Sequence, residues 1–148
     1  MMNQTPKLSY FFATKKDVLI VSLVGPISKD NAVIFDECIR EVKKAPARWV
    51  VLHFRDVTEL DRTQLPALAR LQKTIREKPA ELKVCAVHPD LREMLFAQGL
   101  LREVETYNNM SHALQAIMEE AMDPNRTPQD AKSEVAANAS LYVAKKPA

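Results

Sequence analysis

The sequence predicts an α/β fold with a mixed, mostly parallel sheet, an N-terminal β-hairpin and about four helices. The chain has 148 residues, a length typical of one domain. Two β-branched or aromatic runs at its start precede an alternation of short apolar runs and stretches with helical periodicity. Glycine occurs only at Gly25 and Gly99, which excludes glycine-rich nucleotide loops and the Gly-x-Ser-x-Gly nucleophile turn.

The first two predicted elements form the hairpin. Residues 7–14 and 18–24 are rich in aromatic and β-branched side chains, and the polar turn 15–17 lies between them. We expect Gly25-Pro26 to end the second strand, because these residues interrupt regular structure.

A helix is predicted next, over residues 29–44. Ser28 is its predicted N-cap, and Pro46 prevents its continuation. Apolar residues recur at steps of three and four, which predicts one buried face. These residues are Phe35, Cys38, Ile39 and Val42.

The centre of the chain alternates between strand and helix patterns. Residues 49–54 and 82–87 are short apolar runs, typical of strands that are covered on both faces. Residues 64–77 lie between them and have helical periodicity, and Lys78-Pro79 ends this helix. Its predicted inner residues are Leu65, Leu68, Leu71 (or Gln72) and Ile75.

The last part of the domain repeats this alternation. Pro89 is placed at the first position of a third helix and Gly99 just past its end, as each residue prefers. Residues 104–107 are a short strand, and a final helix covers about residues 110–122. Its predicted apolar face contains Leu114, Ile117, Met118 and Ala121, and that of the third helix contains Leu91, Met94 and Leu95. The element order is therefore β-β-α-β-α-β-α-β-α.

We predict that residues 1–122 form the domain and that residues 123–148 form a flexible C-terminal tail. The tail is rich in proline, alanine and small polar residues and has little periodicity. A small apolar group, Leu141-Tyr142-Val143, interrupts it. Whether this group docks on a domain or serves as a peptide for a partner stays open.

Charge and cysteine content limit the function classes. The chain has 21 basic and 19 acidic residues that alternate along the sequence, so we expect no nucleic-acid partner. Lysine pairs such as Lys15-Lys16 are interpreted as solvated surface residues.

Cys38 and Cys85 lack any metal-binding spacing and are predicted to be buried, reduced thiols. With no apolar run of ~18 residues and no signal-peptide pattern, we expect a cytoplasmic protein that does not insert into membranes.

Three segments carry a family resemblance: VLIVSLVGPIS at 18–28, WVVLHFRDVTELD at 49–61 and LKVCAVHPDLREMLFAQGLLREVETYNNMSHAL at 82–114. In this order and spacing they resemble the STAS domain, the fold of bacterial anti-sigma factor antagonists, over roughly residues 8–121. The resemblance implies a STAS-like fold and a non-enzymatic protein-interaction module for signal transduction and transcription regulation.

The family signature at the start of the second helix is Asp-Ser-Ser/Thr-Gly-Leu. The matching stretch here is Asp61-Arg62-Thr63-Gln64-Leu65, in which arginine replaces the first serine and glutamine replaces glycine. In family members that act as switches, a partner kinase phosphorylates a Ser or Thr of this motif. The resemblance therefore leaves Thr63 as the one candidate phosphosite and implies docking without such a switch.

The resemblance also assigns a partner and a surface. The partner is an anti-sigma factor kinase or another STAS protein, and the surface is the loop and helix at 56–70. The predicted partner-binding residues are Asp61, Arg62, Thr63 and Gln64. Arg62 places a cation there, which favours an acidic patch on the partner.

Pro66 restricts where the second helix starts. With Asp61 as N-cap, Pro66 would be the fifth helical residue and would remove a backbone hydrogen bond. With Thr63 as N-cap, Pro66 is the third helical residue, where no intrahelical N–H is needed. We therefore predict that Thr63 caps the helix through its hydroxyl, a structural role that competes with its role as phosphosite.

Two other functions stay open. STAS-like domains also accompany membrane transporters, so the chain could be a cytoplasmic subunit of a transport system. A small nucleotide-binding protein or enzyme would hold its ligand in the loops 55–63 and 88–90, but no acid/base pair at a defined spacing supports it. We predict no catalytic residue, cofactor or metal, because nothing fixes a ligand geometry among His53, Asp56, Glu59 and Asp61.

Overall fold

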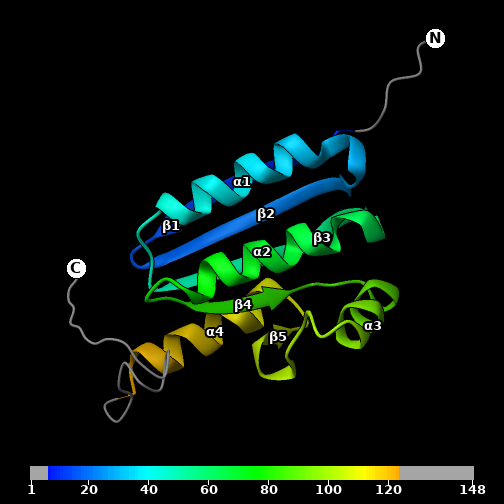
Figure 1. The fold of residues 1–148 in the computed structure, drawn as a ribbon. Coiled ribbons are helices and arrows are strands. Elements are labelled where there is room, and N and C mark those ends of the chain that lie inside the picture. Colours follow the sequence, from blue (N-terminus) through cyan, green and yellow to red (C-terminus); the bar gives the residue numbers. More distant parts are fainter. Residues whose placement is uncertain (1–6, 124–148) are drawn as a thin grey trace.

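A computed structural model describes residues 7–123. In this part of the chain, five strands form one sheet in the order β1-β2-β3-β4-β5, and four α-helices pack around it (Figure 1). β1 and β2 are antiparallel, and every other pair of neighbouring strands is parallel. The predicted fold class is confirmed, whereas the predicted tail from 124 onward lies outside the described residues.

The elements follow the predicted order. The strands are β1 (Ser9–Lys15), β2 (Val18–Ile27), β3 (Trp49–Leu60), β4 (Glu81–Cys85) and β5 (Thr106–Tyr107). The helices are α1 (Ala32–Lys44), α2 (Leu65–Arg76), α3 (Pro89–Ala97) and α4 (Met110–Ala121). Three short 3-10 turns precede α1, α2 and β5: η1 (Lys29–Asn31), η2 (Arg62–Gln64) and η3 (Glu103–Glu105).

The two faces of the sheet have separate cores. Residues of α1 and α2 pack on one face, against inward side chains of β2 and β3 such as Leu23 and Leu52. α4 packs on the other face with a smaller group of residues. Because side chains alternate along a strand, Val50 of β3 belongs to the first core and Trp49 to the second. Burial of the apolar residues of both cores stabilises this arrangement.

β2 and β3 are longer than predicted. β2 does not end at Gly25-Pro26 but continues to Ile27, and β3 extends beyond Phe54 to Leu60. The added residues of β2 pair in parallel with those of β3. The register of this pairing shifts between Ser22 and Val24 and again between Gly25 and Pro26. Such bulges let a strand accommodate proline. The prediction of a loop over residues 55–60 is therefore wrong, and this segment is ordered sheet.

Gly25 is required by the close approach of another segment. Its φ is +105°, and a Cβ atom there would lie 2.6 Å from the carbonyl oxygen of Lys7. Any side chain would therefore push the start of β1 away. Gly99, with φ +74°, ends α3 as predicted.

The predicted helix faces are confirmed in α1 and α2, where Phe35, Cys38, Leu68 and Ile75 are buried. The predicted face of α4 is partly wrong, because Met118 is 62% exposed and Ala121 is also exposed. The predicted residues Leu114 and Ile117 do pack on the sheet, together with Ala113 and Glu120, which were not predicted.

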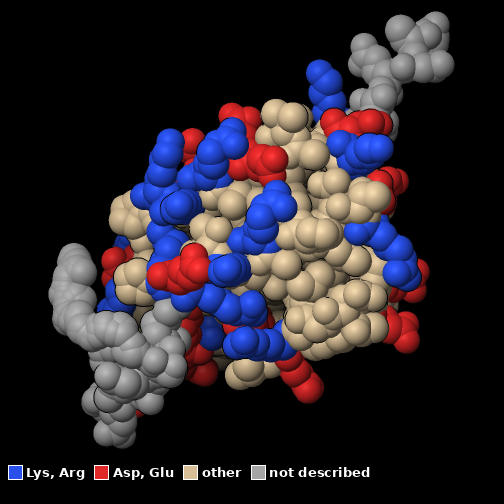
Figure 2. Space-filling model, in the orientation of Figure 1, with Lys and Arg blue, Asp and Glu red and all other residues tan. Residues whose placement is uncertain are grey.

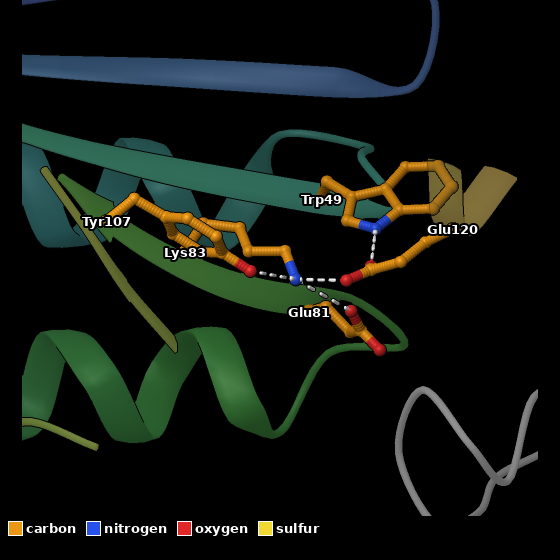
Figure 3. Close-up of polar contacts among 5 residues, drawn as sticks. All are labelled: Trp49, Glu81, Lys83, Tyr107 and Glu120. Carbon is orange, nitrogen blue, oxygen red and sulfur yellow. Dashed lines mark hydrogen bonds and ion pairs between the residues drawn. The ribbon is translucent and has the colours of Figure 1, made fainter. Parts of the chain in front are cut away.

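A polar cluster explains why Glu120 of α4, and not Met118 or Ala121, faces the sheet (Figure 3). Lys83, on β4, is only 5% exposed, and its Nζ donates to Glu120 and to the Tyr107 hydroxyl. Glu120 also accepts a hydrogen bond of 3.1 Å from Trp49 Nε1, and Glu81 lies 3.6 Å from Lys83 Nζ. Buried lysine needs such partners, so position 120 of α4 faces the sheet. Apolar periodicity alone could not predict this.

Candidate functional site

Two similar junctions lie side by side at the edge where the parallel strands end. At each one a strand leads through a 3-10 turn into a helix: β2–η1–α1 and β3–η2–α2. They are joined by a hydrogen bond of 2.9 Å from the Asp61 N–H to the Ile27 carbonyl. The predicted docking residues Asp61–Gln64 all belong to the second junction, which we call the β3–α2 junction.

Asp61 organises the β3–α2 junction. Its carboxylate accepts a hydrogen bond of 3.0 Å from the Thr63 backbone N–H. That bond, together with the Lys29 backbone N–H and the Lys29 charge, holds the pKa of Asp61 below its usual value. Asp61 is therefore the N-cap of η2, and Gln64 occupies the N-cap position of α2 without a side-chain bond, so the prediction that Thr63 caps the helix is wrong.

The 3-10 turn explains how Pro66 is accommodated with Asp61 as the cap. The N–H of Gln64 bonds to the Asp61 carbonyl and that of Leu65 to the Arg62 carbonyl, both across three residues. α2 then begins at Leu65, so Pro66 lies in its first turn, where no N–H is needed. The prediction assumed a continuous α-helix from the cap and did not consider this turn.

The four predicted docking residues differ in exposure. Arg62 and Thr63 are exposed, and Asp61 is partly exposed. Gln64 is only 7% exposed, and its Nε2 donates to the Thr63 hydroxyl over 3.3 Å. In the part of the chain that the structure describes, the Arg62 guanidinium makes no ion pair. Asp61, Arg62 and Thr63 thus form the exposed surface of the junction. Gln64 is buried and contacts the Thr63 hydroxyl.

The end of β3 and the start of α3 border a shallow hollow of about 540 Å³. Val57, Leu91 and Met94 supply apolar surface to it, while Glu59 and Asp90 supply negative charge. Its lining contains no lysine or arginine. In Figure 2, few charged side chains cover the side of the molecule where α2 begins and α3 lies in Figure 1.

Asn31, in the neighbouring β2–α1 junction, is a buried residue that the sequence analysis missed. It is 3% exposed, and its Oδ1 accepts a hydrogen bond from the Leu8 N–H over 3.2 Å. Its Nδ2 donates to the Pro26 carbonyl and to the Ser28 hydroxyl. Ser28 occupies the N-cap position of η1, the turn that leads into α1, but its side chain caps no backbone N–H. No pattern of periodicity signals a buried polar residue that joins the start of β1 to the end of β2.

The structure also places the histidine and the cysteines that the sequence singled out. Across residues 7–123, no three His, Cys, Asp or Glu side chains come together in a way that could hold a metal ion. The pKa of His53 is lowered, chiefly by burial. Cys38 and Cys85 are buried and unpaired, as predicted, and burial raises their thiol pKa to about 12 and about 11. Such thiols stay protonated and are poor nucleophiles.

Membrane insertion was not expected, and no helix among residues 7–123 is both long and apolar enough to span a bilayer. The part of the chain beyond residue 123 lies outside this observation.

Comparison with known proteins gives one matching family and several solved structures with a similar fold. The sequence matches the STAS domain family over residues 12–113. An anti-sigma factor antagonist from Mycobacterium paratuberculosis superimposes with a TM-score of 0.65 at 22% identity, covering 75% of this chain and 94% of that protein. A STAS domain protein from Planctomyces limnophilus gives 0.61 at 17% identity, with 74% and 97% covered. A sulfate transporter family protein from Wolinella succinogenes gives 0.62 at 21% identity, with 72% and 89% covered.

Proposed function

The chain belongs to the STAS domain family, and we propose that it is a non-enzymatic interaction module that binds a regulatory protein through the β3–α2 junction. The proposed partner is an anti-sigma factor kinase or another STAS protein. One observation carries the proposal: Arg62 and Thr63 are exposed on a turn whose backbone is fixed by Asp61 and by the neighbouring β2–α1 junction. A turn held in this way loses little conformational freedom when a partner binds.

The charge of the junction favours an acidic patch on the partner. Arg62 has no acidic partner within the described residues, so its charge is available to a bound protein. The neighbouring hollow supplies apolar contact area through Leu91 and Met94, beside the acidic side chains of Glu59 and Asp90. Apolar area beside a complementary charge is typical of protein interfaces.

We further propose that this module acts without a phosphorylation switch. Arg62 and Gln64 replace two residues of the family signature. The Gln64 side chain is buried and donates to the Thr63 hydroxyl, which ties that hydroxyl to the turn. A kinase would have to release this contact before it could reach the oxygen atom.

The alternative of a nucleotide-binding protein receives no support from the hollow beside the junction. Phosphate groups need cations or a cluster of free backbone N–H groups. The hollow is lined by no lysine or arginine, and its two acidic side chains, Glu59 and Asp90, would repel phosphate; His88 and the first turn of α3 complete that part of the lining. We expect no thermal shift of the full chain with ATP or GTP; a shift of several degrees that Arg62→Ala abolishes would favour the nucleotide function.

The proposal is tested by site-specific photo-crosslinking. A photoreactive amino acid is introduced at position 63, beside an intact Arg62, and, as a control, at Arg40, which is exposed on α1. Position 63 is expected to capture one discrete protein in cells that make the full chain, and position 40 is expected to capture none. Capture at position 40 alone, or equal capture at both positions, would place the interface elsewhere.

The identity of the captured protein separates the two remaining functions. The likeness in fold to a sulfate transporter family protein keeps a second candidate, a subunit of a membrane transport system. Capture of a soluble kinase or a STAS protein supports the regulatory function. Capture of a membrane transport component supports the second candidate and contradicts the first.

A further inference from the structure

Six exposed lysine and arginine side chains gather at the end of the molecule where the parallel strands begin. They come from the turn between β1 and β2, from the end of α1 with the loop that follows it, and from the last turns of α2. We call this surface the basic end; its residues are Lys15, Lys16, Lys43, Lys44, Arg48 and Lys73. It lies at the opposite end of the strands from the β3–α2 junction (Figure 1).

Hydrogen bonds hold the three segments of the basic end together. The backbone N–H of Arg48 donates to the Asp17 carbonyl over 2.8 Å, which joins the hairpin turn to the loop before β3. Lys78 Nζ donates to the carbonyls of Lys43 and Ala45, which joins the ends of α1 and α2. Figure 2 shows Lys and Arg side chains gathered on this side of the molecule.

Most of this positive charge is not neutralised. Within the described residues, Lys15, Lys16, Lys43 and Arg48 make no ion pair. The remaining two cations have only exposed acidic neighbours on their own helices: Lys44 and Glu41 are 3.7 Å apart, and Lys73 and Glu77 are 4.0 Å apart. Such pairs hold little attraction in water.

The acidic residues at the end of α4 do not cancel this charge. α4 lies on the other face of the sheet from α1 and α2. Its Glu120 is already engaged by Lys83 and Trp49. The chain is nearly neutral as a whole, with a formal charge of +2, but the six cations of the basic end outnumber the exposed acidic residues of the same segments, which are Asp17, Glu41 and Glu77.

The form of the basic end favours a lipid membrane over a single-stranded nucleic acid. Single-stranded nucleic acids are bound in grooves with aromatic side chains on which bases stack. The large aromatic side chains exposed among the described residues are Phe11, Phe12 and Phe96, none of which belongs to the basic end. An anionic membrane requires only accessible cations at a surface, because its attraction acts through the summed charge.

We propose that the basic end binds the anionic surface of a lipid membrane peripherally. Long lysine side chains from a turn and two helix ends would contact the headgroups together. The β3–α2 junction, at the other end of the strands, would then face away from the bilayer and remain accessible to a protein. This proposal does not depend on the function proposed for the junction.

The test is co-sedimentation of the full chain with vesicles. Vesicles of phosphatidylcholine containing about a third phosphatidylglycerol are compared with phosphatidylcholine alone. The protein is expected to bind only the anionic vesicles at low salt and to be released at about 0.5 M salt, where charges are screened within a few ångströms. No binding to anionic vesicles at low salt, or binding that salt does not weaken, would overturn the proposal.

Two charge-matched variants locate the binding surface. Lys15→Glu/Lys16→Glu/Lys43→Glu removes half of the basic end, and we expect at least a tenfold loss of vesicle binding. The control Lys29→Glu/Arg55→Glu/Arg102→Glu changes three exposed cations elsewhere by the same total charge and should retain most of the binding. Equal loss in both variants would show an effect of net charge alone and contradict the proposal. Melting curves confirm that both variants fold.

Competition with an oligonucleotide decides between the two classes of anion. We expect that a short double-stranded DNA does not displace the wild-type chain from anionic vesicles at equal phosphate concentration. Displacement by the DNA, lost in the triple variant of the basic end, would identify nucleic acid as the partner of this surface instead.

Discussion

The β2–α1 and β3–α2 junctions have the same backbone plan but satisfy their polar groups in opposite ways. The first is closed by Asn31, whose buried amide joins the start of β1 to the end of β2 and the turn after it. The second is held by the partly exposed carboxylate of Asp61, and the residues that follow it, Arg62 and Thr63, are exposed. Interior hydrogen bonds make the first junction a structural element, whereas the second keeps its side chains accessible to a partner.

The largest expected effect is on stability, at the closed junction. Asn31→Ala would leave the Leu8 N–H without its buried partner and remove the two hydrogen bonds from the amide nitrogen. Each buried polar group without a partner costs about 1–3 kcal/mol, so we expect a loss of about 2–4 kcal/mol in urea unfolding. Lys29→Ala, in the same turn but exposed, should change stability by less than about 0.5 kcal/mol. Equal effects of the two changes would remove the distinction between a closed and an open junction.

The second effect is on binding, at the open junction. Arg62→Glu should weaken the complex with the captured partner at least tenfold, because it places a negative charge opposite the expected acidic patch. Its melting temperature should stay within about 2 °C of the wild type, as for other exposed substitutions. Isothermal titration and melting curves measure both quantities. An affinity equal to that of Arg40→Glu would contradict the assignment of the surface.

A smaller effect is expected for Asp61, which supports the open junction without being buried. Asp61→Ala removes the acceptor for the Thr63 N–H, but water can replace it at the surface. We expect the melting temperature to fall by less than with Asn31→Ala, and the affinity for the partner to fall because the turn becomes less ordered. A loss of stability as large as that of Asn31→Ala would show that both junctions are structural.

The smallest expected change is in the phosphorylation of Thr63 when a kinase acts on the wild-type chain. After incubation of the full chain with its captured kinase and ATP, the intact mass should show no added phosphate. Arg62→Ser/Gln64→Gly, which restores the family signature and removes the contact to the Thr63 hydroxyl, should gain one phosphate. Phosphate on the wild-type chain at Thr63 would restore the switch, and its absence from the double variant would mean that the surrounding surface has diverged as well.

Patterns along the chain were sufficient for the order of elements and for the inner faces of α1 and α2. There, apolar burial decides the orientation, and residues such as Phe35 and Leu68 reveal it through their spacing. The same rule failed for α4, because a charged contact between Lys83 and Glu120 decides its orientation. A buried ion pair between residues far apart in sequence has no periodic signal.

The candidate site shows a similar division. The resemblance to the family predicts Asp61–Gln64 as the docking residues, but local rules misjudged the structural roles of single residues in this stretch. Thr63 was expected to cap the helix because the 3-10 turn before Pro66 was not foreseen. Gln64 was expected at the surface, whereas the structure buries it under Thr63. The basic end was also hidden, because its lysines come from segments that only the fold brings together.

The most direct test of the docking surface is hydrogen–deuterium exchange of the full chain, alone and saturated with the captured partner. Peptides that cover residues 56–70 are expected to exchange more slowly in the complex, while peptides that cover 28–40 keep the same rates. Unchanged rates over 56–70, with protection at the β2–α1 junction or at the basic end instead, would contradict the account.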